Sequence, residues 1–234
     1  MASPVKTEWT SVAVPGGAFF DAYLATPPAG QGPGLVLFQE IFGVNAHIRS
    51  VAEQYALDGF VVLAPDIFWR SERRVDLGYE GADRQRGIQL AGQLKGPELG
   101  LDMVAAVTAL RSRSEVSGKL GAIGYCMGGR LAFLAAATAG VDAAVAYYGG
   151  GIHDQLDKAA GIECPVLFHY AERDDHISMA AVDKVRDAMQ GKRAEVHVYE
   201  GAMHGFNCWA RASYHAPSAA LAHGRSLQFL AQLF

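Results

Sequence analysis

Short and almost uninterrupted apolar runs, separated by longer amphipathic segments, limit the folds open to this chain more than any other feature. Residues 34–39, 60–64 and 119–123 are the clearest of these runs. A strand that helices cover on both sides has this pattern, because neither of its faces meets water. Four further strands are predicted at residues 19–25, 143–148, 165–170 and 194–199.

Amphipathic segments between the runs predict helices. They are expected at residues 47–57, 99–111, 131–139, 178–189 and 218–233. Repeated strand–helix–strand units predict an α/β fold, with a mostly parallel central sheet of about eight strands and helices on both faces. Residues 68–100 are the least regular stretch, and long connections often contact a substrate. We expect one domain over residues 1–234, since α/β folds of this length commonly stay undivided.

The composition excludes several classes of protein. Half of the residues are hydrophobic, which suits a large core, and no lysine- or arginine-rich run predicts a nucleic-acid partner. Cys126, Cys164 and Cys208 match neither a disulfide framework nor a zinc motif. Residues 1–10 do not resemble a signal peptide, and no apolar run is long enough to span a membrane. A cytoplasmic protein is predicted, with the oligomeric state left open between a monomer and a weak dimer.

A glycine-rich turn follows the predicted strand at residues 119–123. It reads Gly-Tyr-Cys-Met-Gly-Gly over residues 124–129, which is the G-x-S-x-G nucleophile elbow of the α/β-hydrolase fold with cysteine in the serine position. Such a tight turn strains the nucleophile, and its glycines avoid collisions with the strand and the helix. The helix N-terminus favours a thiolate and a developing oxyanion. Cys126 is therefore the predicted nucleophile; the alternative is a buried cysteine in a glycine-rich helix cap.

The acid and the base of such a site follow later strands, in the chain order nucleophile, acid, base. One strand leads to two aspartates, and Asp174 is predicted as the acid because Asp175 is better placed to cap the next helix. The last strand leads to His204 in a glycine-containing loop, so His204 is the predicted base. His169 and His176, near the acid loop, are its competitors.

A cysteine nucleophile implies a particular reaction. An ordinary thiol is mostly protonated at neutral pH, so an imidazole must take its proton before the sulfur attacks a carbonyl carbon. The resulting thioester is then hydrolysed by water that His204 activates. An enol-lactone suits this route, because its leaving group is a stabilised enolate. The competing hypothesis is a non-catalytic protein, in which Cys126 is a redox-sensing thiol.

These motifs together resemble the dienelactone hydrolase family. The resemblance rests on Gln-Glu-Ile-Phe-Gly-Val-Asn at residues 39–45, the cysteine elbow at residues 124–129, and the loops around Asp174 and His204. It implies an α/β-hydrolase fold, no metal or organic cofactor, and a small enol-lactone substrate of the carboxymethylenebutenolide type from the degradation of aromatic compounds. A carboxylic ester or thioester hydrolase of broad specificity is the alternative on the same scaffold.

The resemblance also implies roles for residues outside the triad. Glu40 would lie beside the nucleophile and help to deprotonate or orient Cys126. The backbone N–H groups of Ile41 and Met127 would stabilise the oxyanion. Tyr148 would contact the substrate or support the acid loop, with a core aromatic residue as the alternative.

Arginines of the family hold a carboxylate of the substrate. Arg86 stands where the first arginine is expected, and its neighbour Arg84 competes for the role. The second arginine follows the catalytic histidine by four residues. Cys208 takes that position here, and Arg211 is the nearest substitute. We therefore expect substrate recognition in this chain to depart from the family pattern.

Overall fold

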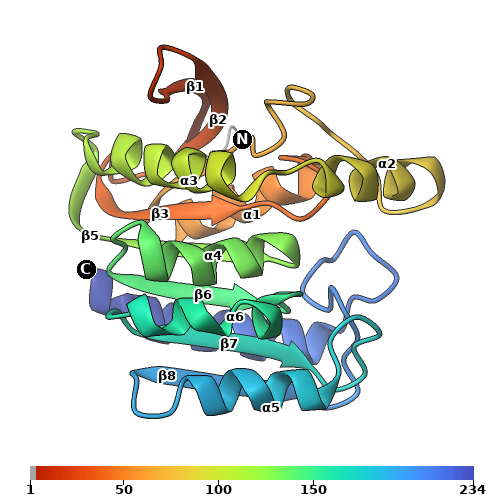
Figure 1. Ribbon diagram of the computed structural model, residues 1–234. Helices are drawn as coiled ribbons and strands as arrows, with labels where there is room; N and C mark the ends of the chain where they lie inside the picture. Colours follow the sequence, from red (N-terminus) through yellow and green to blue (C-terminus); the bar gives the residue numbers. More distant parts are fainter. Residues whose placement is uncertain (1–3) are drawn as a thin grey trace.

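The strands predicted from the apolar runs, and one strand that was not predicted, lie side by side in one sheet. They are β1 (Lys6–Ala13), β2 (Phe19–Thr26), β3 (Gly32–Phe38), β4 (Val61–Pro65), β5 (Val116–Tyr125), β6 (Ala143–Tyr147), β7 (Val166–Ala171) and β8 (Ala194–Tyr199). The computed structural model describes residues 4–234, and in this range the sheet has the order β1-β2-β4-β3-β5-β6-β7-β8 (Figure 1). β1 and β4 pair with β2 in antiparallel fashion, and all other neighbours are parallel. The predicted mostly parallel sheet of about eight strands is confirmed.

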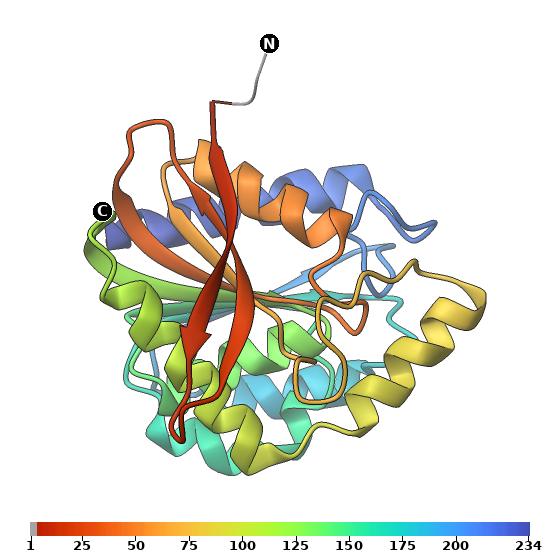
Figure 2. The same ribbon diagram turned by 90° about the horizontal axis from the view of Figure 1, so that it is seen from above.

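Helices cover both faces of this sheet. They are α1 (Ala46–Leu57), α2 (Gly81–Gly92), α3 (Gly96–Arg111), α4 (Met127–Thr138), α5 (Met179–Ala188) and α6 (Ala216–Leu230), with short 3₁₀ turns η1 (Ile152–Asp154), η2 (Leu156–Gly161) and η3 (Ala231–Leu233). Seen from above, α1 and α6 lie on one face, and α3, α4 and α5 lie on the other (Figure 2). Every residue of β3, β4, β6 and β7 is buried as a result, as their apolar sequences predict.

The register of the strands brings the candidate site residues to one edge of the sheet. Phe38, at the end of β3, is opposite Gly124 of β5. The loops that carry Glu40, Cys126 and Tyr148 directly follow the ends of β3, β5 and β6. In Figure 1 the arrowheads of β6 and β7 point toward this edge, where α2 and the loop after β8 also lie. Ligands of open α/β sheets bind outside the carboxyl ends of the strands, so this edge is where a site is expected.

Two elements differ from the sequence prediction. β1 was not predicted, because this edge strand is mostly exposed and has no continuous apolar run. α2 lies within residues 68–100, which the sequence marks as irregular. Only Gly87 and Leu90 of this helix are buried, so its apolar stripe is too narrow to be recognised.

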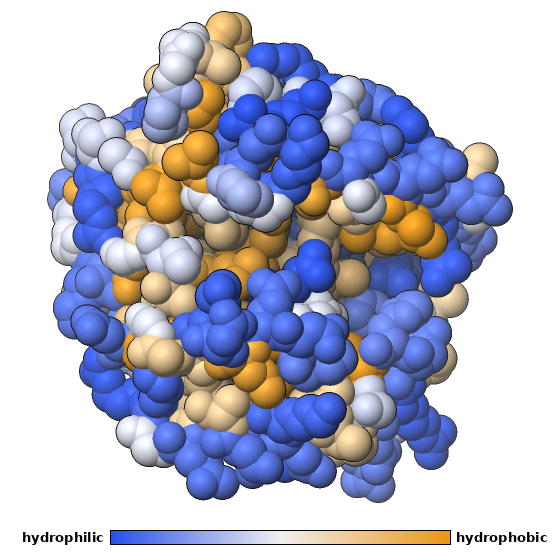
Figure 3. Space-filling model, viewed as in Figure 1, coloured by the Kyte–Doolittle hydropathy of each residue, from blue (hydrophilic) through white to orange (hydrophobic). Residues whose placement is uncertain are grey.

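The helices that the structure describes include no candidate for a membrane span. No helix within residues 4–234 combines the length and the apolar character needed to cross a membrane. Residues 1–10 are the segment that does not resemble a signal peptide. Its first three residues lie outside the described part of the chain. Hydrophilic residues dominate the rim of the view in Figure 3, and hydrophobic residues gather nearer its middle.

Candidate active site

The turn after β5 holds Cys126 in a conformation that side-chain-bearing residues rarely adopt. Its φ and ψ angles are 56° and −118°, outside the main regions allowed to L-residues. Strain of this kind costs on the order of 1–3 kcal/mol and persists only where the surrounding structure enforces it. β5 ends at Tyr125 and α4 begins at Met127, so the half-buried Cys126 stands between strand and helix. The geometry is that of a nucleophile elbow.

The close approach of backbone segments explains two glycines of this elbow. A Cβ atom on Gly124 would lie 2.0 Å from the carbonyl oxygen of Gly128. A Cβ atom on Gly128 would lie 2.1 Å from the carbonyl oxygen of Phe38, the last residue of β3. Only glycine fits at either position. The second contact also packs the elbow against the end of the strand that leads to Glu40.

The loops after β7 and β8 bring Asp174 and His204 together. Nδ1 of His204 donates a hydrogen bond to Oδ2 of Asp174 over 2.9 Å, and both side chains are buried. The other carboxylate oxygen of Asp174 accepts the N–H groups of His176 and Ile177, over 2.8 and 3.0 Å. These bonds hold the carboxylate in place, so Asp174 can orient the imidazole as the acid of a triad does.

The second ring nitrogen of His204 is available for proton transfer. Nε2 is buried and has no hydrogen-bond partner within residues 4–234. Burial by itself lowers the pKa of His204, but the neighbouring Cys126 and the bond to Asp174 outweigh it, so the net pKa is raised. Cys126 is thus a neighbour of this imidazole, and proton exchange between the two belongs to the proposed mechanism.

The residues that compete with this pair in the sequence have other roles. Ser178 caps α5 with its own side chain, so the expectation that Asp175 caps this helix is wrong. His169 is buried in β7, where both ring nitrogens are hydrogen-bonded inside the core. His176 is exposed and packs edge-on against His204, with ring centroids 4.9 Å apart. His204 is therefore the histidine that an aspartate orients at this edge.

Glu40 follows β3 and is almost completely buried. Its Oε1 accepts a hydrogen bond from Nη1 of Arg211 over 3.2 Å, while Oε2 has no partner in the described part of the chain. Burial raises the pKa of Glu40, and the positive charges of Arg211 and His204 oppose this shift. Glu40 also lies near His47 and Cys208, with the potential ligand atoms of the three residues within 4.8 Å of one another. Such a set of donors suits a metal ion.

Tyr148 packs against His204, and the two predicted oxyanion donors directly follow Glu40 and Cys126 in the sequence. Tyr148 is completely buried, and its ring packs edge-on against His204 with a centroid distance of 5.1 Å. Ile41 directly follows Glu40. Met127 is the first residue of α4, so its N–H has no carbonyl acceptor within the helix. A contact of any of these residues with the substrate stays a prediction.

An open cavity of about 320 Å³ adjoins His204. It is lined by Tyr79, Glu80, Arg84, Asp175, His176, Met203, His204, Arg211, Ala212 and Ser213. The lining includes Arg84 but not Arg86, which pairs with Glu72 on the surface. Successive helical residues turn by about 100°, so two residues of α2 that are two positions apart point in nearly opposite directions. Arg84 therefore faces the cavity beside His204 and Arg86 does not, and the binding of a substrate carboxylate by either arginine stays a prediction.

Comparison with known proteins shows to which family this chain belongs. The model for the dienelactone hydrolase family matches residues 20–234. The chain belongs to the dienelactone hydrolase family. A carboxymethylenebutenolidase from Pseudomonas putida is 34% identical over 229 residues and covers 97% of each chain. Carboxymethylenebutenolidase 1 from Cupriavidus pinatubonensis is 29% identical over 220 residues and covers 93% of each chain.

Solved structures agree with this dienelactone hydrolase assignment. A crystal structure from Klebsiella pneumoniae subsp. pneumoniae has a TM-score of 0.88 and 29% sequence identity, and the match covers 97% of this chain and 99% of that one. The dienelactone hydrolase from Anabaena variabilis has a TM-score of 0.71 at 19% identity, with 99% of each chain covered, and shows the fold alone. The predicted α/β-hydrolase fold and the predicted hydrolase class are confirmed.

Two residues near Glu40 in this dienelactone hydrolase have roles that the sequence did not predict. Arg211 was considered only as a substitute for an arginine absent at position 208, and it proves to be the partner of Glu40. His47 was not singled out at all, since it lies in α1 among residues of ordinary helical pattern. No spacing in the sequence links His47 to Cys208, which is 161 residues away.

Proposed function

We propose that this protein hydrolyses a small enol-lactone of the dienelactone type, with Cys126 as its nucleophile. The observation that carries the proposal is the strained Cys126 beside His204, whose ring Asp174 orients through a 2.9 Å hydrogen bond. A cysteine in this geometry needs an imidazole to accept its proton, and we assign that step to the Nε2 atom of His204, which has no hydrogen-bond partner among residues 4–234. The names of the similar carboxymethylenebutenolidases support the same reaction.

The proposed reaction proceeds through a thioester. The proton of the Cys126 thiol passes to a base of the site, and the sulfur attacks the lactone carbonyl carbon. The ring C–O bond then breaks, the enolate oxygen leaves, and the acyl group stays on sulfur. Water next gives a proton to His204 and attacks the thioester, which releases a carboxylate and restores the thiol. The N–H groups of Ile41 and Met127 are the proposed donors to the oxyanion in both steps.

Glu40 has a proposed role in activating Cys126. Arg211 binds Glu40 and also lines the cavity beside His204. A carboxylate on the substrate would compete for this guanidinium. Loss of the nearby positive charge raises the pKa of a buried carboxylate and makes it a stronger base. Glu40 would then help His204 to deprotonate Cys126 only when an anionic substrate is present.

Two arginines that line the cavity support the proposal that the substrate carries a carboxylate. Arg84 reaches the cavity from α2, and Arg211 reaches it from the loop after β8. Arginine is well suited to bind a carboxylate through two parallel hydrogen bonds. Enol-lactones with a free carboxylate arise in the degradation of aromatic compounds, and we propose that the substrate belongs to this class. A cytoplasmic location is part of the same proposal.

The proposed reaction is tested by a mass spectrum of the protein quenched with acid during turnover of a dienelactone. We expect one acyl group on Cys126, with the mass of the opened lactone. Cys126→Ala should carry no adduct, and Cys164→Ser should carry the same adduct as the unchanged protein. Acylation of a serine, or of Cys164 or Cys208, would overturn the assignment of the nucleophile.

A hydrolase of broad specificity is the second candidate, and Cys208 favours it. The family carries an arginine at this position for the substrate carboxylate, and a thiol cannot replace that charge. Rates on a neutral ester such as p-nitrophenyl acetate distinguish the two. A dienelactone specialist should prefer the anionic lactone by a factor of roughly 10² or more, because charge-assisted hydrogen bonds are worth about 1.5–3 kcal/mol each.

A further inference from the structure

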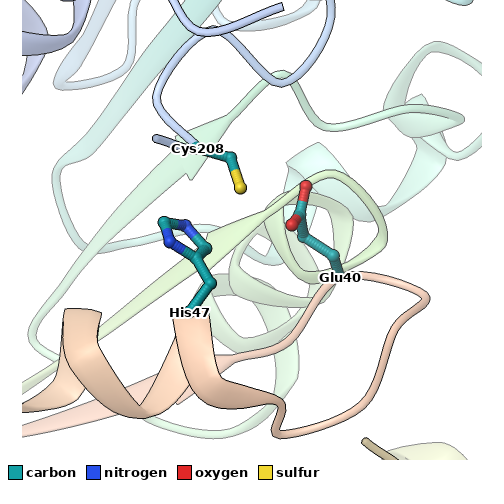
Figure 4. A group of neighbouring side chains, drawn as sticks. All are labelled: Glu40, His47 and Cys208. Carbon is teal, nitrogen blue, oxygen red and sulfur yellow. The ribbon is translucent and has the colours of Figure 1, made fainter. Parts of the chain in front are cut away.

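Three side chains from distant parts of the chain converge beside the catalytic edge. Glu40 follows β3, His47 is in the first turn of α1, and Cys208 lies in the loop after β8. Their carboxylate, imidazole and thiol point toward a common centre in Figure 4, and the potential ligand atoms lie within 4.8 Å of one another. All three side chains are buried, with at most 4% of the residue exposed.

Two potential ligand atoms of this cluster, Oε2 of Glu40 and Nδ1 of His47, are buried and lack a hydrogen-bond partner among residues 4–234. Arg211 binds only Oε1 of Glu40, and Oε2 has no hydrogen-bond partner among residues 4–234. A buried carboxylate oxygen without a hydrogen bond is costly, so a cation at this oxygen would be stabilising. Because Arg211 binds only Oε1, a cation could bind Oε2 while the ion pair between Arg211 and Glu40 stays in place.

We propose that Glu40, His47 and Cys208 form a binding site for a thiophilic divalent cation such as Zn²⁺, and that its occupancy inhibits the hydrolase. Carboxylate oxygen, imidazole nitrogen and thiolate sulfur are each ligands of zinc, and open zinc sites combine three protein ligands with water in the fourth position. Bond lengths of about 2.0 Å to nitrogen and 2.3 Å to sulfur require the side chains to move closer than they lie now by small rotations. As the sulfur–metal bond forms, the thiol of Cys208 releases its proton to solvent.

The groups that face the cluster set its charge. Arg211 is the cation that faces the cluster, and it opposes a second positive charge. With thiolate and carboxylate counted against the guanidinium, the cluster carries one net negative charge, which a divalent cation reverses.

The cavity beside His204 provides a route to this cluster. Tyr79 and Arg211 both line the cavity. Arg211 also binds Glu40, and the hydroxyl of Tyr79 interacts with Cys208. The cavity therefore borders two side chains that neighbour the cluster, and we assign the approach of a cation to this side.

Inhibition follows from the role of Glu40, and this part of the inference rests on the proposed function. A metal ion on Oε2 would hold the carboxylate away from Cys126. The carboxylate could then no longer help to deprotonate Cys126 when substrate arrives. The cation would also repel the guanidinium of Arg211, which weakens its hold on an anionic substrate.

Zinc titration of the Cys126→Ala protein tests the site without depending on catalysis. We expect one Zn²⁺ per chain by calorimetry, and Co²⁺ should give the intense absorption of a thiolate-to-cobalt charge transfer. Cys208→Ser should abolish this absorption, and His47→Asn should weaken zinc binding at least roughly tenfold. Cys164→Ser is the matched control and should bind like its parent. Thermal unfolding of each variant without metal confirms that it is folded.

The Cys126→Ala background separates this site from the catalytic pair, since Cys126 and His204 could also bind zinc. Binding that is lost in Cys126→Ala but kept in Cys208→Ser would overturn the proposal. In the protein with Cys126 intact, Zn²⁺ should inhibit hydrolysis, and Cys208→Ser should raise the inhibitory concentration at least roughly tenfold. Equal zinc inhibition of both proteins would refute the inhibitory role. A protein that binds zinc at the cluster but hydrolyses no ester would refute the proposed function alone.

Discussion

Arg211 holds the buried carboxylate of Glu40 through one contact of 3.2 Å, and it does so from the wall of the cavity beside His204. The same guanidinium therefore faces an acidic group of the protein and any ligand that enters. Arg211 stands three residues beyond Cys208 in the sequence. If the substrate carries a carboxylate, as proposed, recognition of that group and control of Glu40 would be joined in this one side chain.

Arg84→Ala should weaken catalysis on an anionic lactone. We expect kcat/KM to fall by roughly 10- to 100-fold, because one charge-assisted hydrogen bond is worth about 1.5–3 kcal/mol. Hydrolysis of p-nitrophenyl acetate should change by less than about threefold, since this ester has no carboxylate to bind. Arg86→Ala is the matched control on the same helix. A larger loss in Arg86→Ala than in Arg84→Ala would show that α2 presents the other arginine to the substrate.

Cys126→Ala should abolish turnover while the protein stays folded. Loss of a nucleophile typically lowers kcat by about 10⁴-fold or more, because no covalent intermediate can form. Cys126→Ser should be weakly active, since a hydroxyl gives up its proton far less readily than a thiol. Circular dichroism and thermal unfolding verify the fold, and steady-state kinetics give the rates. Substantial turnover by Cys126→Ala would remove the central assignment.

His204→Ala should lower kcat by about 10³-fold or more, because it removes the base that accepts the thiol proton and later activates water. His176 offers a matched control, since its ring packs against His204 and lines the same cavity but contacts Asp174 only through its backbone N–H. His176→Ala should change kcat by less than about tenfold. Comparable losses in the two variants would mean that the base is misassigned.

Gly128→Ala should unfold or strongly destabilise the protein. The added methyl group would lie 2.1 Å from the carbonyl oxygen of Phe38, and this backbone is fixed in the centre of the sheet. Overpacking against backbone costs on the order of 3 kcal/mol or more. Gly100→Ala in α3 is the control, because a Cβ there meets nothing within 4 Å. It should stabilise the protein by about 0.5–1 kcal/mol, as measured by urea unfolding.

Asp66 should make stability depend on pH in the acidic range. Burial raises the pKa of this carboxyl to about 6, although the N–H groups of Arg74 and Phe68 donate to it. A raised pKa means that the folded chain binds the proton more tightly than the unfolded chain. The stabilising contribution is therefore complete below about pH 4 and is lost as the pH rises to about 6, at no more than roughly 1.4 kcal/mol per pH unit.

Urea unfolding of the unchanged protein and of Asp66→Asn between pH 4 and pH 7 measures this effect. The difference between the two free energies of unfolding should change across the window and become constant above it. Two parallel curves would contradict the role of Asp66, because other titrating groups contribute equally to both proteins.

Local patterns in the sequence determined the fold class, most of the strands and the candidates for the proposed triad. Apolar runs predicted the buried strands because burial on both faces demands such runs, and β8 begins and ends where it was predicted. The glycines around Cys126 and the chain order of Asp174 and His204 are likewise features of consecutive residues. Such patterns could not predict β1, because an exposed edge strand needs no apolar signature.

Relationships between distant segments were decided only by the tertiary structure. The sequence could not distinguish Arg84 from Arg86, because their difference is the direction in which α2 faces once it packs. It could not pair Arg211 with Glu40, since 171 residues separate them and no periodic pattern joins them. The meeting of Glu40 with Cys208 has the same origin: parallel strands end at one edge of the sheet, and side chains from unrelated loops become neighbours there.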